Sequence, residues 1–448
     1  MEHMAKTLHQ VASARSALLF ERGKRVFPDG TTRVTVERDP NPLYIARGEG
    51  AYLVDVDGNR LLDLNNNFTT LIHGHGFQPV VRAVGTLLKS GTCFANPTEH
   101  EIALAELLTQ RIPTIESIRF VNSGSEAVMF AIKAARAFTG KPAIARIEGA
   151  FHGAYDWAET GQSGTPDTWG APDNPRPVAL YKGVPESVAN DVIVLRFNDI
   201  EAAERRITAA AEKLSCIIID PMPSRAGLIA ARTGFFDALA TLAKRHGILI
   251  LADEVLNLRQ GYRGASARYG IVPDLMAMGK IIGGGFPIGA IGGRAEVMQV
   301  FSIANGKPAL PQGGTFSANP VSMVAGRVAM EAMSEGAFAR LEIMGVRLRS
   351  ELDAVIGRFD APFSVTGAAS LFRIHPKGRP PQDFRDAYAD RAETAVMDRM
   401  CRHFLESGIV LPKGAAACLS TAMVDEDINK IIAAFASFLD TTKGDGKT

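Results

Sequence analysis

The sequence predicts an α/β protein with a large domain built on a mostly parallel sheet and a smaller α+β domain formed by both chain ends. Between about residues 100 and 330, short apolar segments alternate with helix-like segments, which is typical of parallel strands covered by helices. In residues 50–64, apolar and polar residues alternate on both sides of an Asp-Gly turn, which favours an antiparallel hairpin. Helical periodicity returns at 323–333 and 337–359, and mixed strand and helix signals follow.

We therefore expect residues 76–330 to form the large domain, and residues 1–75 and 331–448 to form the smaller one together. The stretch 152–188 is rich in Gly, Pro, Ser and Asp and has no clear periodicity, so we expect a lid over an active site. The strands expected in the large domain are 118–121, 143–147, 192–197, 216–219 and 248–251.

Composition and charge argue against several classes of protein. The 448 residues carry a net charge of +1, which offers no electrostatic footprint for nucleic acid or an anionic membrane. The apolar runs that end at Asp220 and Asp253 are too short to span a bilayer. Residues 1–20 lack an apolar core followed by a small-residue cleavage site, so secretion is not indicated. We expect a cytoplasmic protein whose partners are small molecules or further copies of itself.

The cysteines give no sign of a metal site or a disulfide framework. Cys93, Cys216, Cys401 and Cys418 are widely separated, and none belongs to a CxxC or Cys/His cluster. We expect four thiols, mostly buried, and no bound metal.

The first motif that carries chemistry is NSGSEA at 122–127, which follows a strand and opens a helix. Ser123, Gly124 and Ser125 would leave several backbone N–H groups exposed at the positive end of the helix dipole, as a phosphate requires. An ordinary helix cap has the same residue types, so this motif alone leaves both interpretations open.

An acid pair follows a later strand, and a lysine lies between apolar residues and glycines further along the chain. Asp253 and Glu254 stand at the end of a buried strand, where open α/β sheets place ligands, and a carboxylate there can pair with a protonated ring nitrogen or simply cap a helix. Lys280 lies between MAMG and IIGGG, and loss of hydration there would favour the neutral amine that attacks carbonyl groups. A solvated loop lysine is the alternative, and the preceding Gly spacing of a Walker A motif is absent.

Two further motifs are modest alone. FHG at 151–153 places Phe151 at a strand end, where it could stack on a planar cofactor or belong to the core. GTFSANP at 314–320 places Thr315 before a helix.

Taken in order, these five motifs resemble those of the class III aminotransferases, which have the pyridoxal-5'-phosphate (PLP) transferase fold type I. The resemblance extends from about Arg33 to the C-terminal region and is densest over 120–320. It implies PLP as cofactor, a Schiff base and proton transfer at Lys280, and pairing of Asp253 with the pyridine nitrogen.

The same resemblance implies the remaining cofactor contacts. Ser123, Gly124 and Ser125 would hold the phosphate, while Phe151 and Val255 would cover the two faces of the ring. Thr315 would contact the phosphate bound by a neighbouring subunit. A homodimer with active sites at its interface is implied.

Three segments, 261–265, 269–275 and 279–293, resemble the glutamate-1-semialdehyde aminomutase branch, which also contains transaminases for β-amino and aromatic α-amino acids. Residues 27–50 resemble the β-amino acid transaminases, in which the arginine matching Arg33 binds the substrate carboxylate; an exposed surface arginine is the alternative. Lys413 stands where those enzymes can carry an arginine for a second carboxylate. It keeps the charge but loses the planar fork.

The sequence departs from the family pattern at three places. Residues 414–417 supply no side-chain carboxylate, and GTFSANP replaces GTLSGNP, and both differences argue against a true aminomutase. Asp220-Pro221 replaces the more usual Glu-Pro.

We therefore expect amino transfer between a carboxylate-bearing amino acid and an oxo acid, with β-amino and aromatic donors among the candidates. The alternative is intramolecular transfer of the glutamate-1-semialdehyde 2,1-aminomutase kind. A nicotinamide oxidoreductase is disfavoured because no GxGxxG follows an early strand. The presence of both Lys280 and Asp253 argues against a non-catalytic binding module.

Overall fold

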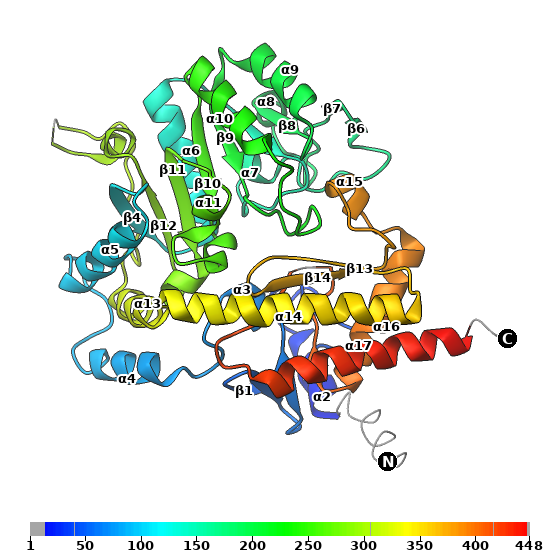
Figure 1. The fold of residues 1–448 in the computed structure, drawn as a ribbon. Coiled ribbons are helices and arrows are strands. Elements are labelled where there is room, and N and C mark those ends of the chain that lie inside the picture. The colour runs from blue at the N-terminus through cyan, green and yellow to red at the C-terminus, as the bar shows by residue number, and fades with distance from the viewer. Residues whose placement is uncertain (1–13, 40, 305, 415, 446–448) are drawn as a thin grey trace.

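The computed structural model describes residues 14–445 apart from residues 40, 305 and 415 (Figure 1). The expectation about a leader within residues 1–20 falls largely outside the described residues, as do one position of the 414–417 segment and the ends of both predicted terminal segments.

A seven-stranded sheet lies at the centre of the larger part of the molecule, and its strand order is β4-β12-β11-β10-β9-β5-β8. Of these seven strands, β12 alone runs in the direction opposite to the other six. The mostly parallel sheet predicted from the sequence is confirmed. The strands are β4 (Ser117–Val121), β5 (Ala143–Ile147), β8 (Val192–Leu195), β9 (Leu214–Ile219), β10 (Leu249–Asp253), β11 (Leu275–Gly279) and β12 (Gly289–Gly293).

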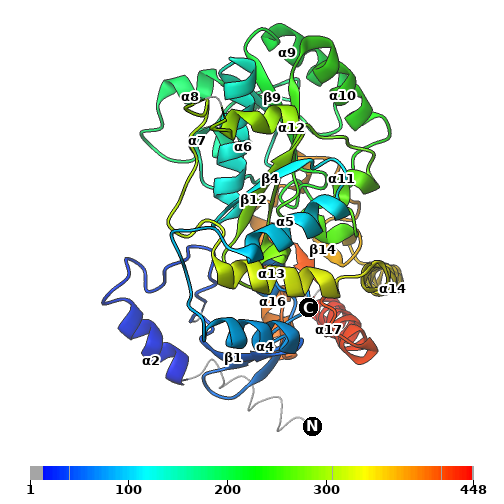
Figure 2. The same cartoon turned by 90° about the vertical axis from the view of Figure 1, so that its left-hand side faces the viewer.

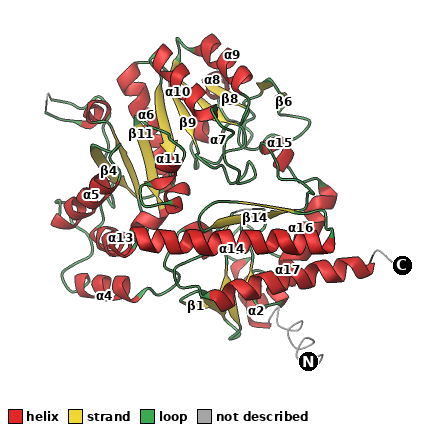
Figure 3. Cartoon of the chain, viewed as in Figure 1, coloured by secondary structure: helices red, strands yellow, loops and turns green. Residues whose placement is uncertain are grey.

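Helices cover both faces of this sheet, so its strands are apolar at nearly every position (Figures 1 and 3). On β9, Ile218 packs in the cluster of α6 (Gly124–Thr139), whereas Ile217 packs in that of α9 (Ile200–Ala210) and α10 (Phe235–His246). Successive side chains of a strand point to opposite faces, which explains why one strand serves both clusters.

The two chain ends share a sheet below the large one. β15 (Ile409–Val410) pairs parallel with β3 (Arg60–Asp63), which is followed by β2 (Tyr52–Asp55) and β1 (Ile45–Glu49). β2 and β3 form the predicted antiparallel hairpin. The boundaries near residues 75 and 330 stay a prediction.

A second sheet of this lower part joins β13 (Ser364–Thr366), β14 (Leu371–His375) and β16 (Ala417–Cys418). The long helix α14 (Glu335–Phe359) packs against α17 (Asp425–Asp445), which also contacts α16 (Arg391–Glu406). Figure 2 shows these helices at the opposite end of the molecule from α9 and α10.

Four further helices are α2 (Ala14–Gly23), α4 (Gln78–Leu87), α5 (Glu99–Arg111) and α13 (Pro320–Ala332). Helix α13 packs on both α4 and α5. None of the helices among the described residues has the length and apolarity required to cross a membrane.

The 152–188 stretch contains α7 (Asp156–Glu159), the short pair β6 (Gly170–Ala171) and β7 (Asn174–Pro175), and the start of α8 (Glu186–Asn190). Arg385 on α15 (Phe384–Ala387) donates to the carbonyl oxygens of Trp169 and Gly170. The same guanidinium forms a bidentate ion pair with Glu148, at 2.9 Å for each bond. These bonds attach the stretch to the C-terminal part of the chain.

The central sheet supplies a test of the fold. Ile218 is fully buried in β9, so Ile218→Ala should lower the free energy of unfolding by about 2 to 5 kcal/mol through lost apolar contact and a residual cavity. Ile303→Ala is the matched control, because that side chain is 73% exposed and should change stability by less than about 0.5 kcal/mol. Urea midpoints measure both effects, and equal midpoints would contradict the two-sided core.

Candidate active site

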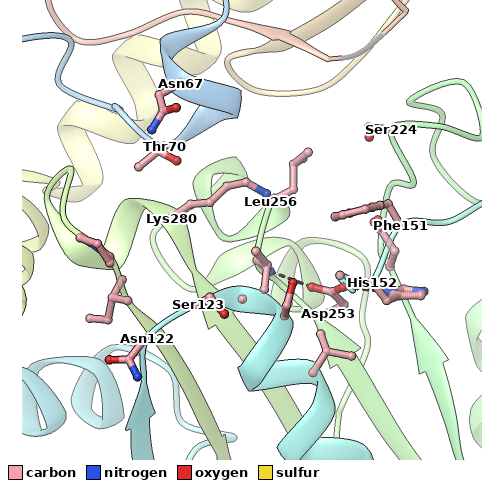
Figure 4. A pocket seen from close by; sticks show the side chains of 18 of the residues that line it. Asn67, Thr70, Asn122, Ser123, Phe151, His152, Ser224, Asp253, Leu256 and Lys280 are labelled. Atoms are coloured by element: carbon pink, nitrogen blue, oxygen red, sulfur yellow. Dashed lines mark hydrogen bonds and ion pairs between the residues drawn. The ribbon is translucent and has the colours of Figure 1, made fainter. Parts of the chain in front are cut away.

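A cavity of about 510 Å³ lies at the carboxyl ends of the parallel strands (Figure 4). Its residues come from the loops that directly follow β4, β5, β9, β10 and β11, because parallel strands bring those ends to one edge of the sheet. Arg33, Asn67 and Thr70 from the N-terminal part also line it. Figure 4 shows Asn67 and Thr70 on one side, Ser123 and Asp253 on the other, and the Lys280 side chain between them.

The helix α6 begins at the cavity with its first N–H groups available. Ser123 is the extended N-cap, its Oγ accepts from the Glu126 backbone N–H at 3.1 Å, and the Glu126 carboxylate accepts from the Asn122 N–H at 2.6 Å. Among the described residues, no hydrogen bond satisfies the N–H groups of Gly124 and Ser125. An anion is their natural partner.

Two glycines keep this end of the helix open. A Cβ on Gly124 would lie 2.6 Å from Val255 Cγ1, and one on Gly153 would lie 2.4 Å from Ser125 Oγ. Gly153 also has a φ of 88°, which disfavours any other residue. The predicted phosphate cup is thus a close-packed cradle with free N–H donors, which fits the phosphate of PLP.

Lys280 follows β11 and opens a short 3₁₀ turn, Lys280–Gly283, with a φ of 50°. Burial lowers the pKa of its amine, although the carboxylates of Asp253 and Asp220 act in the opposite direction. No hydrogen bond or ion pair engages the amine within the described part of the chain. A neutral, unengaged amine is the form that attacks a carbonyl carbon.

Asp253 is buried at the end of β10, where two groups fix its carboxylate. Oδ1 accepts from the Val255 N–H at 3.0 Å, and Oδ2 lies 2.7 Å from His152 Nδ1. Burial lowers the pKa of His152, so the neutral ring donates its Nδ1–H to Asp253. This arrangement keeps a carboxylate facing the cavity, as a protonated pyridine nitrogen requires.

His152 is the central residue of the FHG motif, for which the sequence predicted a role at Phe151 alone. β9 lies between β5 and β10, so neither spacing nor strand order alone indicates that this histidine contacts Asp253. The one available signal was its place directly after a strand end.

Asp220 lies on the same edge, after β9. Its Oδ1 accepts from the Met222 N–H at 3.0 Å and from Asn257 Nδ2 at 2.5 Å. Burial, with the neighbouring charge of Asp253, raises the pKa of Asp220 well above its usual range. Asp220 stands where the family pattern more often has Glu, and its bond is to Asn257 on the short turn Asn257–Gln260.

Phe151 and Val255 both line the cavity, and the Phe151 ring is 52% exposed. Of the stretch predicted as a lid, only His152 and Gly153 are among the lining residues, so this structure does not place that stretch over the cavity. Thr315 is exposed and does not line the cavity of its own chain.

Lys413 is not brought into the cavity either. Its amine pairs with the Asp398 carboxylate of α16 and lies 3.8 Å from that of Glu37. It lines a separate, smaller cavity with Arg373 and His375. The structure does not bring Lys413 to the cavity of Lys280, and its expected role in binding a substrate carboxylate stays a prediction.

Arg33 does line the cavity, beside a strained turn that sequence reasoning missed. The guanidinium donates through one NH group to Asn67 Oδ1 at 3.2 Å. Asn67 belongs to α3 (Asn66–Thr69), whose four residues have φ values of 47°, 50°, 53° and 71°. Left-handed backbone costs non-glycine residues roughly 1 to 2 kcal/mol each. Three successive asparagines were the available signal, since asparagine tolerates this region best.

Comparison with known proteins agrees with this geometry. The family model for aminotransferase class III matches residues 34–437. A glutamate-1-semialdehyde 2,1-aminomutase from Methanothermobacter thermautotrophicus is 35% identical over 432 residues, covering 96% of this chain and 100% of that protein.

Two solved structures are also similar. An omega-transaminase from Sphaerobacter thermophilus is 44% identical with a TM-score of 0.93, covering 97% of this chain and 99% of the other. A β-phenylalanine aminotransferase from Variovorax paradoxus is 30% identical with a TM-score of 0.87, covering 99% and 97%. Matched over nearly its whole length, the chain belongs to the class III aminotransferases, PLP-dependent enzymes of fold type I.

Proposed function

We propose that this enzyme moves an amino group between a carboxylate-bearing amino acid and an oxo acid. The observation that carries the proposal is the presence of the Arg33 guanidinium in the same cavity as Lys280 and Asp253. A planar guanidinium suits a carboxylate because it can donate two parallel hydrogen bonds. β-Amino and aromatic amino acids are the donors we favour, and the similarity to a β-phenylalanine aminotransferase supports them.

PLP, when bound, supplies an electron sink for the substrate carbon that loses its proton. Lys280 would hold the cofactor covalently and then carry that proton on its freed amine, a role that the lowering of its pKa by burial supports. Asp253 would accept a hydrogen bond from the ring nitrogen, and His152 would keep the carboxylate in place.

The remaining contacts follow the walls of the cavity. The N–H groups of Gly124 and Ser125, with the Ser123 hydroxyl, would bind the phosphate, and Phe151 and Val255 would cover opposite faces of the ring. Each of these groups lies on a loop that follows a strand of the sheet or at the start of α6.

We further propose a homodimer. Thr315 is exposed and lies outside its own chain's cavity, which is consistent with a contact to the phosphate in a neighbouring subunit. Lys413 lies outside the cavity of Lys280, and its predicted contact to a substrate carboxylate is not part of the proposed site.

Lys280 gives the most direct test. Borohydride reduction of the PLP-loaded enzyme should attach the cofactor to the peptide containing Lys280, and Lys280→Ala should lower kcat at least about 10²-fold, because a positioned proton carrier is lost. Peptide mass spectrometry and steady-state kinetics measure the two effects. Lys89→Ala, an exposed lysine away from the cavity, is the control. Normal turnover by Lys280→Ala would remove the proposed role.

Arg33 tests the substrate class. Arg33→Ala should raise KM for amino acid donors by about 10- to 100-fold, the usual range for a charged hydrogen bond, and leave KM for amines without a carboxylate nearly unchanged. The control is Arg25→Ala, an exposed arginine that does not line the cavity. Equal losses for both kinds of donor would mean that Arg33 does not bind the carboxylate.

Aminomutase activity is the second candidate, because curated relatives at 35 to 37% identity carry that name. A single half-reaction separates the two. Enzyme loaded with PLP and mixed with the amino donor alone should release free oxo product into solution, since a transaminase lets its first product leave. Retention of the product until an isomer of the donor appears would favour the aminomutase.

A further inference from the structure

We propose that Asn67 is a specificity-determining residue that binds the substrate carboxylate together with Arg33. This inference rests on the proposed function, because it assumes that a carboxylate lies beside Arg33. It adds a neutral donor to that site and assigns a purpose to the strained turn that carries it.

The orientation of the Asn67 amide follows from its bond to Arg33. A guanidinium can only donate, so the atom that it contacts at 3.2 Å must be the carboxamide oxygen, and the NH₂ group must face elsewhere. Asn67 lines the cavity, and within the described part of the chain its NH₂ group has no hydrogen-bond partner. An amide donor and a guanidinium donor therefore stand side by side at one wall, and they match the two oxygens of a carboxylate.

The backbone of the turn is fixed from both ends. At its start, Asp63 Oδ1 accepts from the N–H groups of Asn65 and Asn66 at 2.8 and 3.0 Å. At its end, the buried Arg259 donates to the Thr69 carbonyl oxygen at 3.1 Å. Arg259 is itself bonded to the Leu419 carbonyl at 2.6 Å and to Ser370 Oγ at 3.1 Å. The left-handed turn is thus determined by its surroundings.

Apolar packing does not account for the conformation at Asn67. Asn67 is exposed and lines the cavity, and Phe68 is 38% exposed, so the strain at these two positions is not offset by their own burial. Strained backbone that the surroundings enforce is concentrated at functional sites. The turn places the Asn67 amide at the cavity, where a bound substrate would contact it.

The charges along the cavity make a neutral donor useful. Among its described lining residues Arg33 is the sole arginine, and Lys413 is engaged by Asp398 and Glu37. A carboxylate at this wall accepts from Arg33 but needs a second donor to satisfy its remaining lone pairs. Asn67 Nδ2 is the donor adjacent to Arg33.

The experiment compares two variants in the PLP-loaded full chain. Asn67→Gly removes the amide but adopts positive φ without strain, so the fold should be kept and the thermal midpoint should not fall. Asn67→Asp keeps the shape and replaces the donor with a carboxylate that would pair with Arg33 and repel the substrate. The matched control is Asp360→Gly, a left-handed residue (φ 47°) at the end of α14 and outside the cavity.

Two quantities are measured: the Kd of 3-phenylpropanoate, an unreactive carboxylate, and KM for donors with and without a carboxylate. Asn67→Gly should weaken the carboxylate Kd and raise the amino acid KM by about 5- to 20-fold, with kcat and the KM for carboxylate-free amines little changed. Asn67→Asp should weaken both further, and Asp360→Gly should match the wild type.

Two results would overturn the inference. If Asn67→Gly binds 3-phenylpropanoate as tightly as the wild type while Arg33→Ala does not, Asn67 has no part in carboxylate binding and the proposed function stands. If Asn67→Gly weakens both kinds of donor equally, the turn only supports the cavity. Failure of the proposed function is a separate result, namely that Arg33→Ala itself leaves carboxylate binding unchanged.

Discussion

The carboxylate of Asp253 is buried at the end of β10 and shares Oδ2 with the Nδ1–H of a neutral histidine at 2.7 Å. A buried charge is costly unless hydrogen bonds satisfy it, and here the Val255 N–H and His152 supply them. The same low-dielectric edge lowers the pKa of Lys280 and raises that of Asp220. Burial of these groups together therefore lowers the pKa of the Lys280 amine beside a carboxylate that hydrogen bonds hold in place.

That burial depends in turn on the topology. Parallel strands bring the ends of β4, β9, β10 and β11 to one edge, so residues more than 150 positions apart in the chain line one cavity. The opposite wall comes from the N-terminal part, where Arg259 of the large part donates to the Thr69 carbonyl oxygen of α3. Arg259 also donates to the Leu419 carbonyl oxygen near the C-terminus. The cavity is consequently lined by the N-terminal and large parts of the chain, and the C-terminal part acts on it only through its bonds to Arg259.

Local patterns predicted much of this, and contacts between distant elements account for the rest. The 143–147 strand matched β5 at both ends. Lys280, Asp253 and Ser123 were candidates from their local motifs, and the order of five motifs, through its resemblance to the family, assigned their roles. β11 and β12 were not identified, since the motif around Lys280 and the glycines of GAIGG obscure the strand signal. The bond between His152 and Asp253 crosses β9, and no local pattern encodes it.

Lys413 illustrates how a retained charge can serve a different contact. Its neighbour Glu37 belongs to the segment that carries Arg33, so the lysine links the C-terminal loop to the N-terminal segment. Exposed ion pairs of this kind contribute only about 0 to 1 kcal/mol to stability, which is too little to hold the Arg33 segment in place by themselves. Arg38 makes the stronger set of contacts, because it donates to the Arg33 and Val36 carbonyl oxygens and pairs with Asp29. The position of Arg33 therefore depends mainly on the internal bonds of its own segment and on Asn67, and only weakly on Lys413.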